Sequence, residues 1–332
     1  MYKKSIMIKI GILFGGKSAE HEISLQSAKS IYDFLDSSKY EPVLIGIDKD
    51  GKWYLTDSIS FQGEKKPVYL LPENIKLDLV FPVLHGPFGE DGTVQGLLKL
   101  ADIPFAGSGV LSSAVCMDKD ITKRLLRDAG IPIGKFLTLN LHEPIPSFKK
   151  IEENLGNPVF VKPANLGSSV GISKVYSEAE FNAALTEAFK HDKKIILEEF
   201  IPGREIECAV LGNENPKASL AGEIIPSHDF YSYSAKYTDE KGAELIIPAK
   251  LENDILKQIQ ELSVKVFKVL GCKGLARVDF FLKKDGEIIV NEINTMPGFT
   301  KISMFPKLWE ASGISYSELV TALIELAVKE HS

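Results

Sequence analysis

The chain has 332 residues, of which 44% are hydrophobic and 25% are charged, and its formal net charge is −6. This composition is typical of a globular protein, and the acidic balance argues against a nucleic-acid partner. Single hydrophobic cores stop growing at about 250–300 residues, so we expect more than one domain. Cys116, Cys208 and Cys272 lie far apart and form no C-x-x-C pair, which argues against both a disulfide framework and a zinc site.

No stretch of the sequence approaches the roughly 20 apolar residues that cross a bilayer, so we expect no membrane partner. The first residues, MYKKSIMIKIGILFGG, place lysines before an apolar run, as secretory signals do. Lys9 interrupts that run, however, and no A-x-A-like cleavage site follows. We therefore expect the run to be a buried first strand and the protein to be cytoplasmic.

Residues 6–109 alternate short apolar runs with helical patterns, which predicts a parallel sheet with helices on both faces. The apolar runs occur at 8–14, 41–48, 77–86 and 103–109, and the helical patterns at 22–35 and 93–101. Two glycine-bearing loops, GGKSAEHE and HGPFGEDG, follow predicted strands, where ligands of such sheets bind. The first loop lacks the G-x-G-x-x-G fingerprint, which weakens an interpretation as a nicotinamide-dependent oxidoreductase.

The rest of the chain divides into two further regions. The second region contains a predicted helix at 118–130, the segment NPVFVKPANLGSSVGISKVYS, a helix at 178–192 and a strand at 194–203. The third contains GREIECAVLG, a polar and aromatic loop at 226–244, a helix at about 252–270 and a hairpin near 285. We find no internal repeat or long linker, so we expect closely packed domains at 1–112, 113–204 and 205–332.

The segment VKPANLGSSVG places Lys162 at the end of an apolar run and before a small, glycine-rich stretch. A Walker phosphate loop has its lysine after the glycines, so that motif is absent here. Two alternatives remain at this point. The lysine and a flexible loop grip a phosphate in another way, or the segment is a plain strand–turn–strand connection.

The segment LARVDFFLKKDGEIIVNEINTMPG predicts a hairpin with a two-residue turn at 285–286. Counting outward from that turn places Asp279 opposite Glu292 and Arg277 opposite Asn294, with all four side chains on one face. Two carboxylates and an amide suit Mg²⁺, and the adjacent arginine suits an oxyanion or phosphoryl group. The alternative is a solvated strand face with incidental charges. With a magnesium hairpin in place, the lysine and small loop read as a phosphate-binding pair.

Several motifs resemble those of a known family. VKPANLGSSVG, ILEEFIPGREI, ARVDFF and NEINTMPG resemble the ATP-grasp fold, in which two α+β subdomains hold ATP between them. Within that superfamily, GGKSAEHEISL, LHGPFGEDGT, MDKDITK, YSYSAKY and NTMPGFTKIS are similar to the D-alanine–D-alanine ligase family. The resemblance spans essentially the whole chain. It implies an α/β fold, with an N-terminal parallel-sheet, Rossmann-like domain followed by two ATP-grasp subdomains.

The resemblance also implies the reaction. ATP would convert the carboxylate of one D-alanine into an acyl phosphate, which the amine of a second D-alanine attacks. The products would be ADP, phosphate and D-alanyl-D-alanine for peptidoglycan precursor synthesis. Two anions must be brought together, so lysines, an arginine and two Mg²⁺ or Mn²⁺ ions are expected to offset their repulsion. The family further implies a homodimer through the N-terminal domain.

For the nucleotide, the resemblance implies Lys119 and Lys162 on the phosphates and Glu205 on the ribose hydroxyls. Glu198 and Ile201 would line the adenine, largely through main chain. The implied nucleotide site is completed by Ser169, Glu199, Phe200 and Lys236, the last of which would reach the γ-phosphate. The implied metal ligands are Asp279, Glu292 and Asn294. One departure from the family is a glutamate at 199, where many members carry lysine.

For the first D-alanine, the resemblance points to Glu20 as the partner of the ammonium group, with His85 nearby. Arg277 and the backbone N–H of Gly298 would form the oxyanion hole for the tetrahedral intermediate. The second D-alanine would be bound through its carboxylate by Ser303. The implied substrate site also contains Lys236, Tyr237 and Met304.

The polar loop after residue 226 would act as a lid that protects the acyl phosphate from water. A hydrogen-bonded set of Tyr237, Ser168 and Glu20 would join the lid, the small loop and the N-terminal domain. The tyrosine favours an amine over D-lactate as the second nucleophile. A surface loop that binds a partner is the alternative for this segment.

Three other functions compete with this ligase. Another ATP-grasp ligase would keep Lys162 and the hairpin but would not need Glu20, Ser168 and Tyr237 together. A non-catalytic nucleotide-binding protein would not need Arg277 or a complete set of metal ligands. An oxidoreductase would need the dinucleotide fingerprint that is missing.

Overall fold

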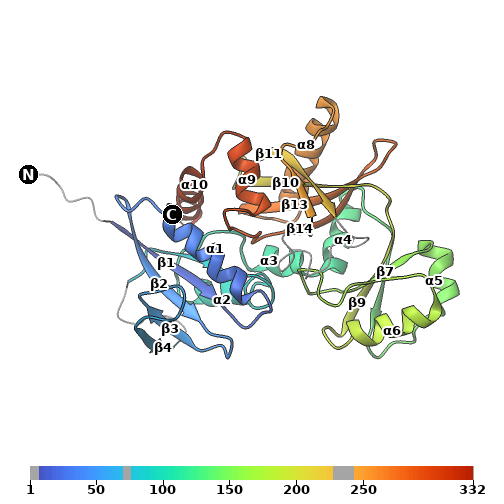
Figure 1. Cartoon of the computed structure of the whole chain (residues 1–332), viewed down its shortest axis with the longest axis horizontal. Helices are drawn as coiled ribbons and strands as arrows, with labels where there is room; N and C mark the ends of the chain where they lie inside the picture. Colours follow the sequence, from blue (N-terminus) through green and yellow to red (C-terminus); the bar gives the residue numbers. More distant parts are fainter. Residues whose placement is uncertain (1–6, 70–75, 227–242, 332) are drawn as a thin grey trace, which may run out of the picture.

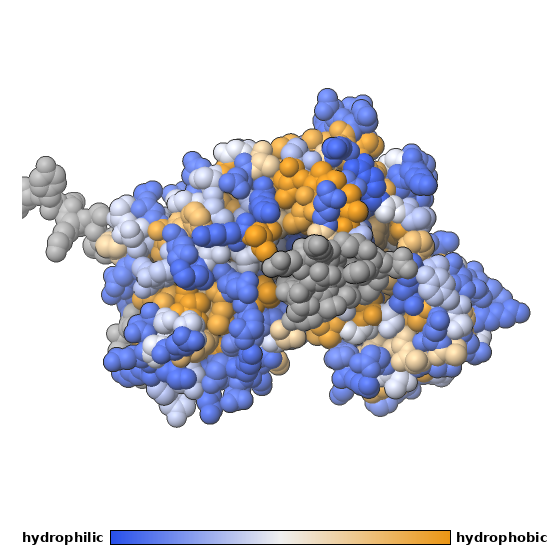
Figure 2. Space-filling view, viewed as in Figure 1, coloured by the Kyte–Doolittle hydropathy of each residue, from blue (hydrophilic) through white to orange (hydrophobic). Residues whose placement is uncertain are grey.

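The computed structural model describes residues 7–69, 76–226 and 243–331, and it contains three sheets. The N-terminal sheet lies at one end of the molecule and the sheet of β7 and β9 at the other, with the third sheet between and above them (Figure 1). The space-filling view shows the outline indented between the two end lobes (Figure 2).

The N-terminal sheet has the strand order β4-β3-β2-β1-β5. Its strands are β1 (Ile8–Gly15), β2 (Tyr40–Ile47), β3 (Trp53–Thr56), β4 (Lys65–Val68) and β5 (Leu79–Val83). β1 is parallel to both β2 and β5, as the alternation predicts. Two details differ from the prediction. The run at 103–109 contributes only a single bridge, from Phe105 to Val80, and β3 and β4 add an antiparallel edge.

Helix α1 (His21–Phe34) follows β1 and turns a face of small residues toward the sheet. Ser24, Ser27, Ala28 and Ile31 are buried at helical spacing, so the helix approaches the strand ends closely. Ser24 accepts a hydrogen bond from the N–H of Gly15 at 2.8 Å. The loop between β1 and α1, which carries Glu20, is thereby fixed at the carboxyl edge of the sheet.

The central sheet, β6-β9-β7-β8, is antiparallel throughout. Its strands are β6 (Phe136–Asn140), β7 (Val159–Pro163), β8 (Ser173–Val175) and β9 (Lys194–Glu199), and its core is completed by α5 (Phe148–Leu155) and α6 (Glu178–Ala188). Val159 and Val161 of β7 point into that core. Because side chains alternate along a strand, Lys162 points to the opposite face.

The third sheet, β12-β11-β10-β13-β14, is also antiparallel. Its strands are β10 (Arg204–Gly212), β11 (Lys217–Pro226), β12 (Ala243–Ile246), β13 (Gly274–Leu282) and β14 (Ile288–Asn294). Its core includes residues of α3 (Val110–Met117), α4 (Lys119–Asp128) and α8 (Asn253–Val269). The segment that begins at 113 therefore packs partly against the third sheet.

The C-terminal helices join the third sheet to the N-terminal part. α9 (Met304–Ala311) and α10 (Tyr316–Glu330) share one hydrophobic core with β1, β5 and α1, while α2 (Thr93–Leu100) packs on a second core of the same sheet. Phe299 lies between Phe81 and Phe305, with ring centroids 6.1 and 5.6 Å away. Within the described part of the chain, no single helix is long and apolar enough to cross a membrane; α9 and α10 meet the criteria only as a pair bent by 104°.

The β13–β14 hairpin corrects one prediction. The turn is not the two-residue 285–286 turn, because the N–H of Lys283 bonds the carbonyl of Glu287 and leaves three residues in the loop. A bulge between Asp279 and Phe280 then shifts the register by one residue. The two irregularities offset one another, so Asp279 still pairs with Glu292 and Arg277 with Asn294.

Candidate active site

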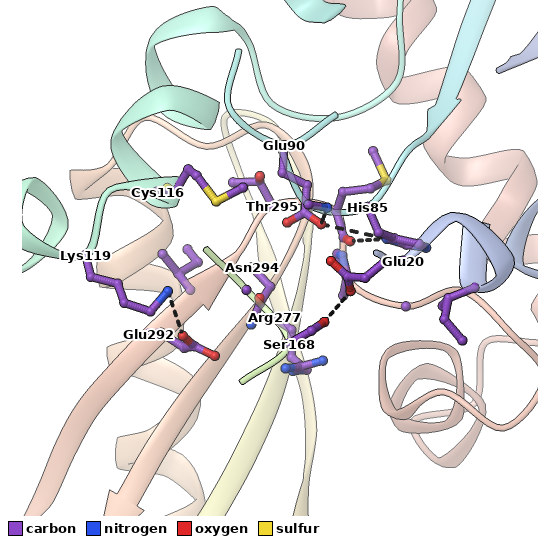
Figure 3. A pocket seen from close by; sticks show the side chains of 18 residues that line it. Glu20, His85, Glu90, Cys116, Lys119, Ser168, Arg277, Glu292, Asn294 and Thr295 are labelled. Atoms are coloured by element: carbon purple, nitrogen blue, oxygen red, sulfur yellow. Dashed lines mark hydrogen bonds and ion pairs between the residues drawn. The ribbon is translucent and has the colours of Figure 1, made fainter. Parts of the chain in front are cut away.

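Two pockets lie where the three sheets meet, and they share an edge. The lysine pocket contains all the described residues that the sequence assigns to a nucleotide: Lys119, Lys162, Ser169, Glu198, Glu199, Phe200, Ile201 and Glu205. The arginine pocket is lined by Glu20, His85, Ser168, Arg277, Glu292, Asn294 and Gly298, among others (Figure 3). Lys119, Gly167, Ser168 and Glu292 line both. A ligand in one pocket therefore reaches the other without crossing the protein core.

Lys162 is held by an ion cluster in the wall of the lysine pocket. Its Nζ lies 2.5 Å from one carboxylate oxygen of Glu198, and Nζ of Lys123 lies 3.1 Å from the other. Burial alone would raise the pKa of Glu198, but the charges of Lys123 and Lys162 lower it to about 2. Burial alone would lower the pKa of Lys162, and Glu198 more than offsets this, so the pKa lies above its ordinary value.

Lys119 joins the small loop to the hairpin at the shared edge. It is the first residue of α4, whose N-cap Asp118 accepts a hydrogen bond from the N–H of Ile121 at 3.1 Å. Its Nζ donates to the carbonyl of Leu166 at 2.7 Å and lies 3.5 Å from a carboxylate oxygen of Glu292 (Figure 3). The helix start thus points a cation at the edge that both pockets share.

The small loop after Lys162 has an unusual backbone. Ser168 and Ser169 have φ values of 53° and 59°, in the left-handed region that non-glycine residues rarely occupy. The Ser168 hydroxyl donates a hydrogen bond to Glu20 of the N-terminal domain (Figure 3). Strained backbone of this kind gathers at binding sites, and here it directs a side chain of the small loop toward the loop that follows β1.

Glu20 and His85 lie at the ends of β1 and β5, where the sequence predicts a ligand. Glu20 is buried, and its carboxylate lies beside Gly86, whose φ of +74° is in the left-handed region that favours glycine. His85 contacts Ser27 at 3.0 Å through Nε2 and the carbonyl of Met296 at 3.1 Å through Nδ1. Burial would lower the pKa of His85, but the neighbouring carboxylates of Glu90 and Glu20 raise it above its ordinary value.

Arg277 is bound by two carboxylates. Its guanidinium makes two hydrogen bonds to Asp279, at 2.7 and 2.6 Å, and its Nε lies 2.9 Å from Glu207 on β10. Burial would lower the pKa of the guanidinium, but the charges of Asp279 and Glu207 hold it well above its ordinary value. The sequence predicts that this arginine stabilises an oxyanion or phosphoryl group. The structure shows that it is also paired with carboxylates.

The predicted metal ligands converge on one face of the hairpin. Asn294 donates to Asp279 at 3.1 Å, and Glu292 lies on the same face within reach of Lys119. Among the described residues, no group of three or more His, Cys, Asp and Glu side chains is arranged as a metal cage. Mg²⁺ commonly takes only one or two carboxylates and completes its shell with water and phosphate oxygens, so this donor set fits it.

Ser303 and Met304 do not line either pocket, although both lie close by in the chain. The Ser303 hydroxyl accepts a hydrogen bond from the N–H of Thr300 at 3.0 Å and lies beside Gly298, where an added Cβ would be 2.9 Å from it. The Met304 side chain is buried in the core against Gly222. Lys236 and Tyr237 lie outside the described residues.

The chain is similar to known proteins in both sequence and structure. The profile described as "D-ala D-ala ligase N-terminus" matches residues 9–108, and "D-ala D-ala ligase C-terminus" matches residues 125–325. The "D-alanine--D-alanine ligase" of Oceanobacillus iheyensis is 52% identical over 97% of this chain and 96% of its own length. The chain belongs to the D-alanine–D-alanine ligase family.

Solved structures of this ligase family extend the likeness to the fold. The D-alanine–D-alanine ligase from Coxiella burnetii has a TM-score of 0.89 and 42% identity, covering 98% of this chain and 95% of that one. A D-Ala:D-Ser ligase from Enterococcus faecalis has a TM-score of 0.90 and 40% identity, covering 97% and 100%. These similarities confirm the predicted family and the α/β fold with ATP-grasp subdomains.

Three charged residues in or next to the site were not predicted from the sequence. Lys123 forms an ion pair with Glu198, and Glu207 forms one with Arg277. A carboxylate oxygen of Glu90 lies 3.8 Å from Nδ1 of His85. Lys123 is the last residue of the quoted motif MDKDITK, so the signal was present but read only at Lys119. The sequence holds no local signal for Glu207, because the pairing of β10 with β13 places it opposite Asp279 and diagonally from its partner Arg277.

Proposed function

We propose that this protein joins two D-alanines with ATP to form D-alanyl-D-alanine, ADP and phosphate for peptidoglycan precursor synthesis. The observation that carries this proposal is the shared edge of the two pockets, lined by Lys119, Ser168 and Glu292. A phosphate held in the lysine pocket and a carboxylate held in the arginine pocket would meet there. The family membership supports the same reaction.

In the lysine pocket, Lys162 and Lys119 would bind the phosphates of ATP. Adenine would lie against the segment 199–201, bound largely by backbone groups. Glu205 would accept hydrogen bonds from the ribose hydroxyls. Glu198 would fix the position of Lys162, and Ser169 would belong to the loop that covers the phosphates. Backbone N–H groups of such small loops are suited to phosphate oxygens.

In the arginine pocket, Glu20 would bind the ammonium group of the first D-alanine, with His85 behind it. Arg277 and the N–H of Gly298 would stabilise the oxyanion that develops when the second D-alanine attacks. Ser303 would bind the second carboxylate. It stands at the N-cap of α9, where the helix dipole favours an anion, and the Met304 backbone follows it.

Asp279, Glu292 and Asn294 would hold Mg²⁺ or Mn²⁺. When bound, the metal would neutralise the phosphate oxygens and bring the transferred group into line. The protein's own part is to orient both substrates and to exclude water. Lys236 and Tyr237 belong to this proposal as lid residues, the first for the γ-phosphate and the second for a hydrogen bond with Ser168.

The steps balance without any further reactant. A carboxylate oxygen of the first D-alanine attacks the γ-phosphorus, and ADP leaves. The amine of the second D-alanine attacks the acyl carbon and gives up a proton to solvent, and phosphate departs with the original carboxylate oxygen. We also propose a cytoplasmic location and, from the family resemblance, a homodimer; the mass in solution would test the homodimer.

The test is D-alanine-dependent ADP release with Mg²⁺, with the product mass determined in the same tube. L-Alanine, D-serine and D-lactate serve as parallel substrates, because one related structure is a D-Ala:D-Ser ligase. We expect ADP and a D-alanine dipeptide in equal amounts. Tight ATP binding without ADP release on any D-alanine concentration would overturn the proposal while leaving the nucleotide pocket intact.

A further inference from the structure

Lys123 is a buried lysine for which the proposed reaction gives no role. It lies on the inner face of α4 with Leu126, and only 3% of it is exposed. Its Nζ is 3.1 Å from Glu198 and 6.0 Å from the ring centroid of Phe136. Because it lines neither pocket, it does not touch a ligand directly. Burying an ammonium group costs desolvation free energy unless the group is paired with an opposite charge. The buried position of Lys123 therefore needs an explanation.

The charge of the lysine pocket supplies that explanation. Its described lining contains two lysines against four glutamates, which is a formal charge of −2 in a pocket proposed for an anion. If Lys162 were the only cation next to Glu198, the two would form a neutral pair. Such a pair would attract the phosphates of a nucleotide only weakly. With Lys123 on the far side, the same carboxylate is shared by two cations, and the cluster carries a net charge of +1.

We propose that Lys123 is a positioning residue that balances Glu198 from behind, so that Lys162 keeps an uncommitted positive charge for the phosphates of the nucleotide. This inference rests on the proposed ATP site. It assigns Lys123 to the recognition of the polyphosphate rather than of adenine or ribose. The buried position matters, because a charge shielded from water acts over a longer distance than an exposed one.

The geometry separates this role from simple packing. The lysine reaches the carboxylate oxygen that Lys162 does not use, so the two ammonium groups do not compete for one atom. Glu198 stays ionised because its pKa is about 2, so the cluster keeps its composition at every pH at which the protein is expected to work. A lysine that only filled space would gain nothing from this arrangement.

The test compares three ligands on one variant. Dissociation constants of ATP, ADP and adenosine are measured by competition, with Mg²⁺ present, for the wild type and for Lys123→Met. We expect ATP and ADP to bind ~10-fold or more weakly, and adenosine to change by less than ~2-fold. Lys149→Met, at an exposed position of α5 in the same subdomain, removes the same charge as a control and should leave all three constants unchanged.

A second variant guards against misfolding. Lys123→Met with Glu198→Gln removes one charge of each sign, which returns the cluster to a net charge of +1. We expect the ratio of adenosine to ATP dissociation constants to return to within ~3-fold of the wild type, and Lys123→Arg to retain it. Equal weakening of all three ligands, or no recovery in the double variant, would overturn the inference. Failure of the wild type to bind any of the three ligands would instead overturn the proposed function.

Discussion

Two buried ion clusters on either side of the shared pocket edge have opposite composition. In the lysine pocket, the carboxylate of Glu198 lies between two ammonium groups. In the arginine pocket, the guanidinium of Arg277 lies between the carboxylates of Asp279 and Glu207. The side chains alone leave the first cluster positive and the second negative. The sign of each cluster fits the ligand proposed for it, because a positive cluster suits phosphates and a negative one suits a metal cation.

The largest effect is expected when Arg277 is removed from the negative cluster. We expect Arg277→Met to lower kcat for ligation by ~10³-fold or more, because the oxyanion loses its cation. Nucleotide binding should stay within ~3-fold of the wild type, since the positive cluster is untouched. Steady-state kinetics and ATP binding check the two statements.

Stability of the same variant provides the control. Removing the guanidinium leaves Glu207 and Asp279 buried without their cation, so the free energy of unfolding should fall by about 3–5 kcal/mol. Arg277→Lys keeps the charge and should recover most of that stability but little of the activity, because an ammonium cannot bind bidentately. Full activity in the lysine variant would contradict the oxyanion role.

A change at the negative cluster alone should act on the metal. Asp279→Asn keeps the side-chain volume but removes one negative charge, so we expect the Mg²⁺ concentration at half-maximal activity to rise ~10-fold or more. Asp285→Asn, at the exposed hairpin turn of the same two strands, is the matched control. An unchanged magnesium titration for the Asp279 variant would contradict the metal assignment.

Acid should act on the positive cluster. The pKa of Glu198 is lowered from 4.5 to about 2 in the folded protein, so its stabilising effect is complete above 4.5 and is lost as the pH falls from about 4.5 to about 2. That shift corresponds to about 3 kcal/mol in the free energy of unfolding. The stability gap between the wild type and Glu198→Gln should therefore shrink by about this amount over that range in urea unfolding. Glu153→Gln, at an exposed position of α5, should show no such change.

The smallest effect is expected from a substitution in the β13–β14 turn, which should leave both ion clusters unchanged. Gly286 has a φ of +88°, and an added Cβ would meet only Ile255 at an ordinary 3.8 Å. Gly286→Ala should thus cost about 1 kcal/mol of unfolding free energy from backbone strain alone. Magnesium titration and nucleotide affinity should match the wild type. A change in either would mean that the turn, and not the strand pairing, positions the site.

The fold shows where local patterns are informative. The buried apolar strands β1, β2 and β5 were predicted because parallel strands covered on both faces read as continuous apolar runs. β3 and β4 were missed because short strands with partly or fully exposed side chains carry little hydrophobic pattern. The pairing of Asp279 with Glu292 was predicted correctly from a turn that was wrong, since a bulge offset the error.

Local sequence patterns also identify only some of the side chains in the site. Residues within a motif, such as Lys162 and Glu20, were identified because their neighbours in sequence share the site. Lys123 reads as one of several basic residues on an amphipathic helix, and the sequence does not say which of them points inward. Glu207 acquires its partner only through the pairing of distant strands, which no local pattern predicts.

The measurement that tests the meeting of the two pockets most directly is the fate of the carboxylate oxygen. D-Alanine labelled with ¹⁸O in its carboxylate is incubated with ATP and Mg²⁺, and the phosphate and dipeptide are analysed by mass. Attack of the first carboxylate on the γ-phosphate predicts one ¹⁸O atom in each phosphate released per dipeptide formed. Unlabelled phosphate alongside labelled dipeptide would contradict an acyl phosphate and, with it, the shared edge as the place where the two substrates react.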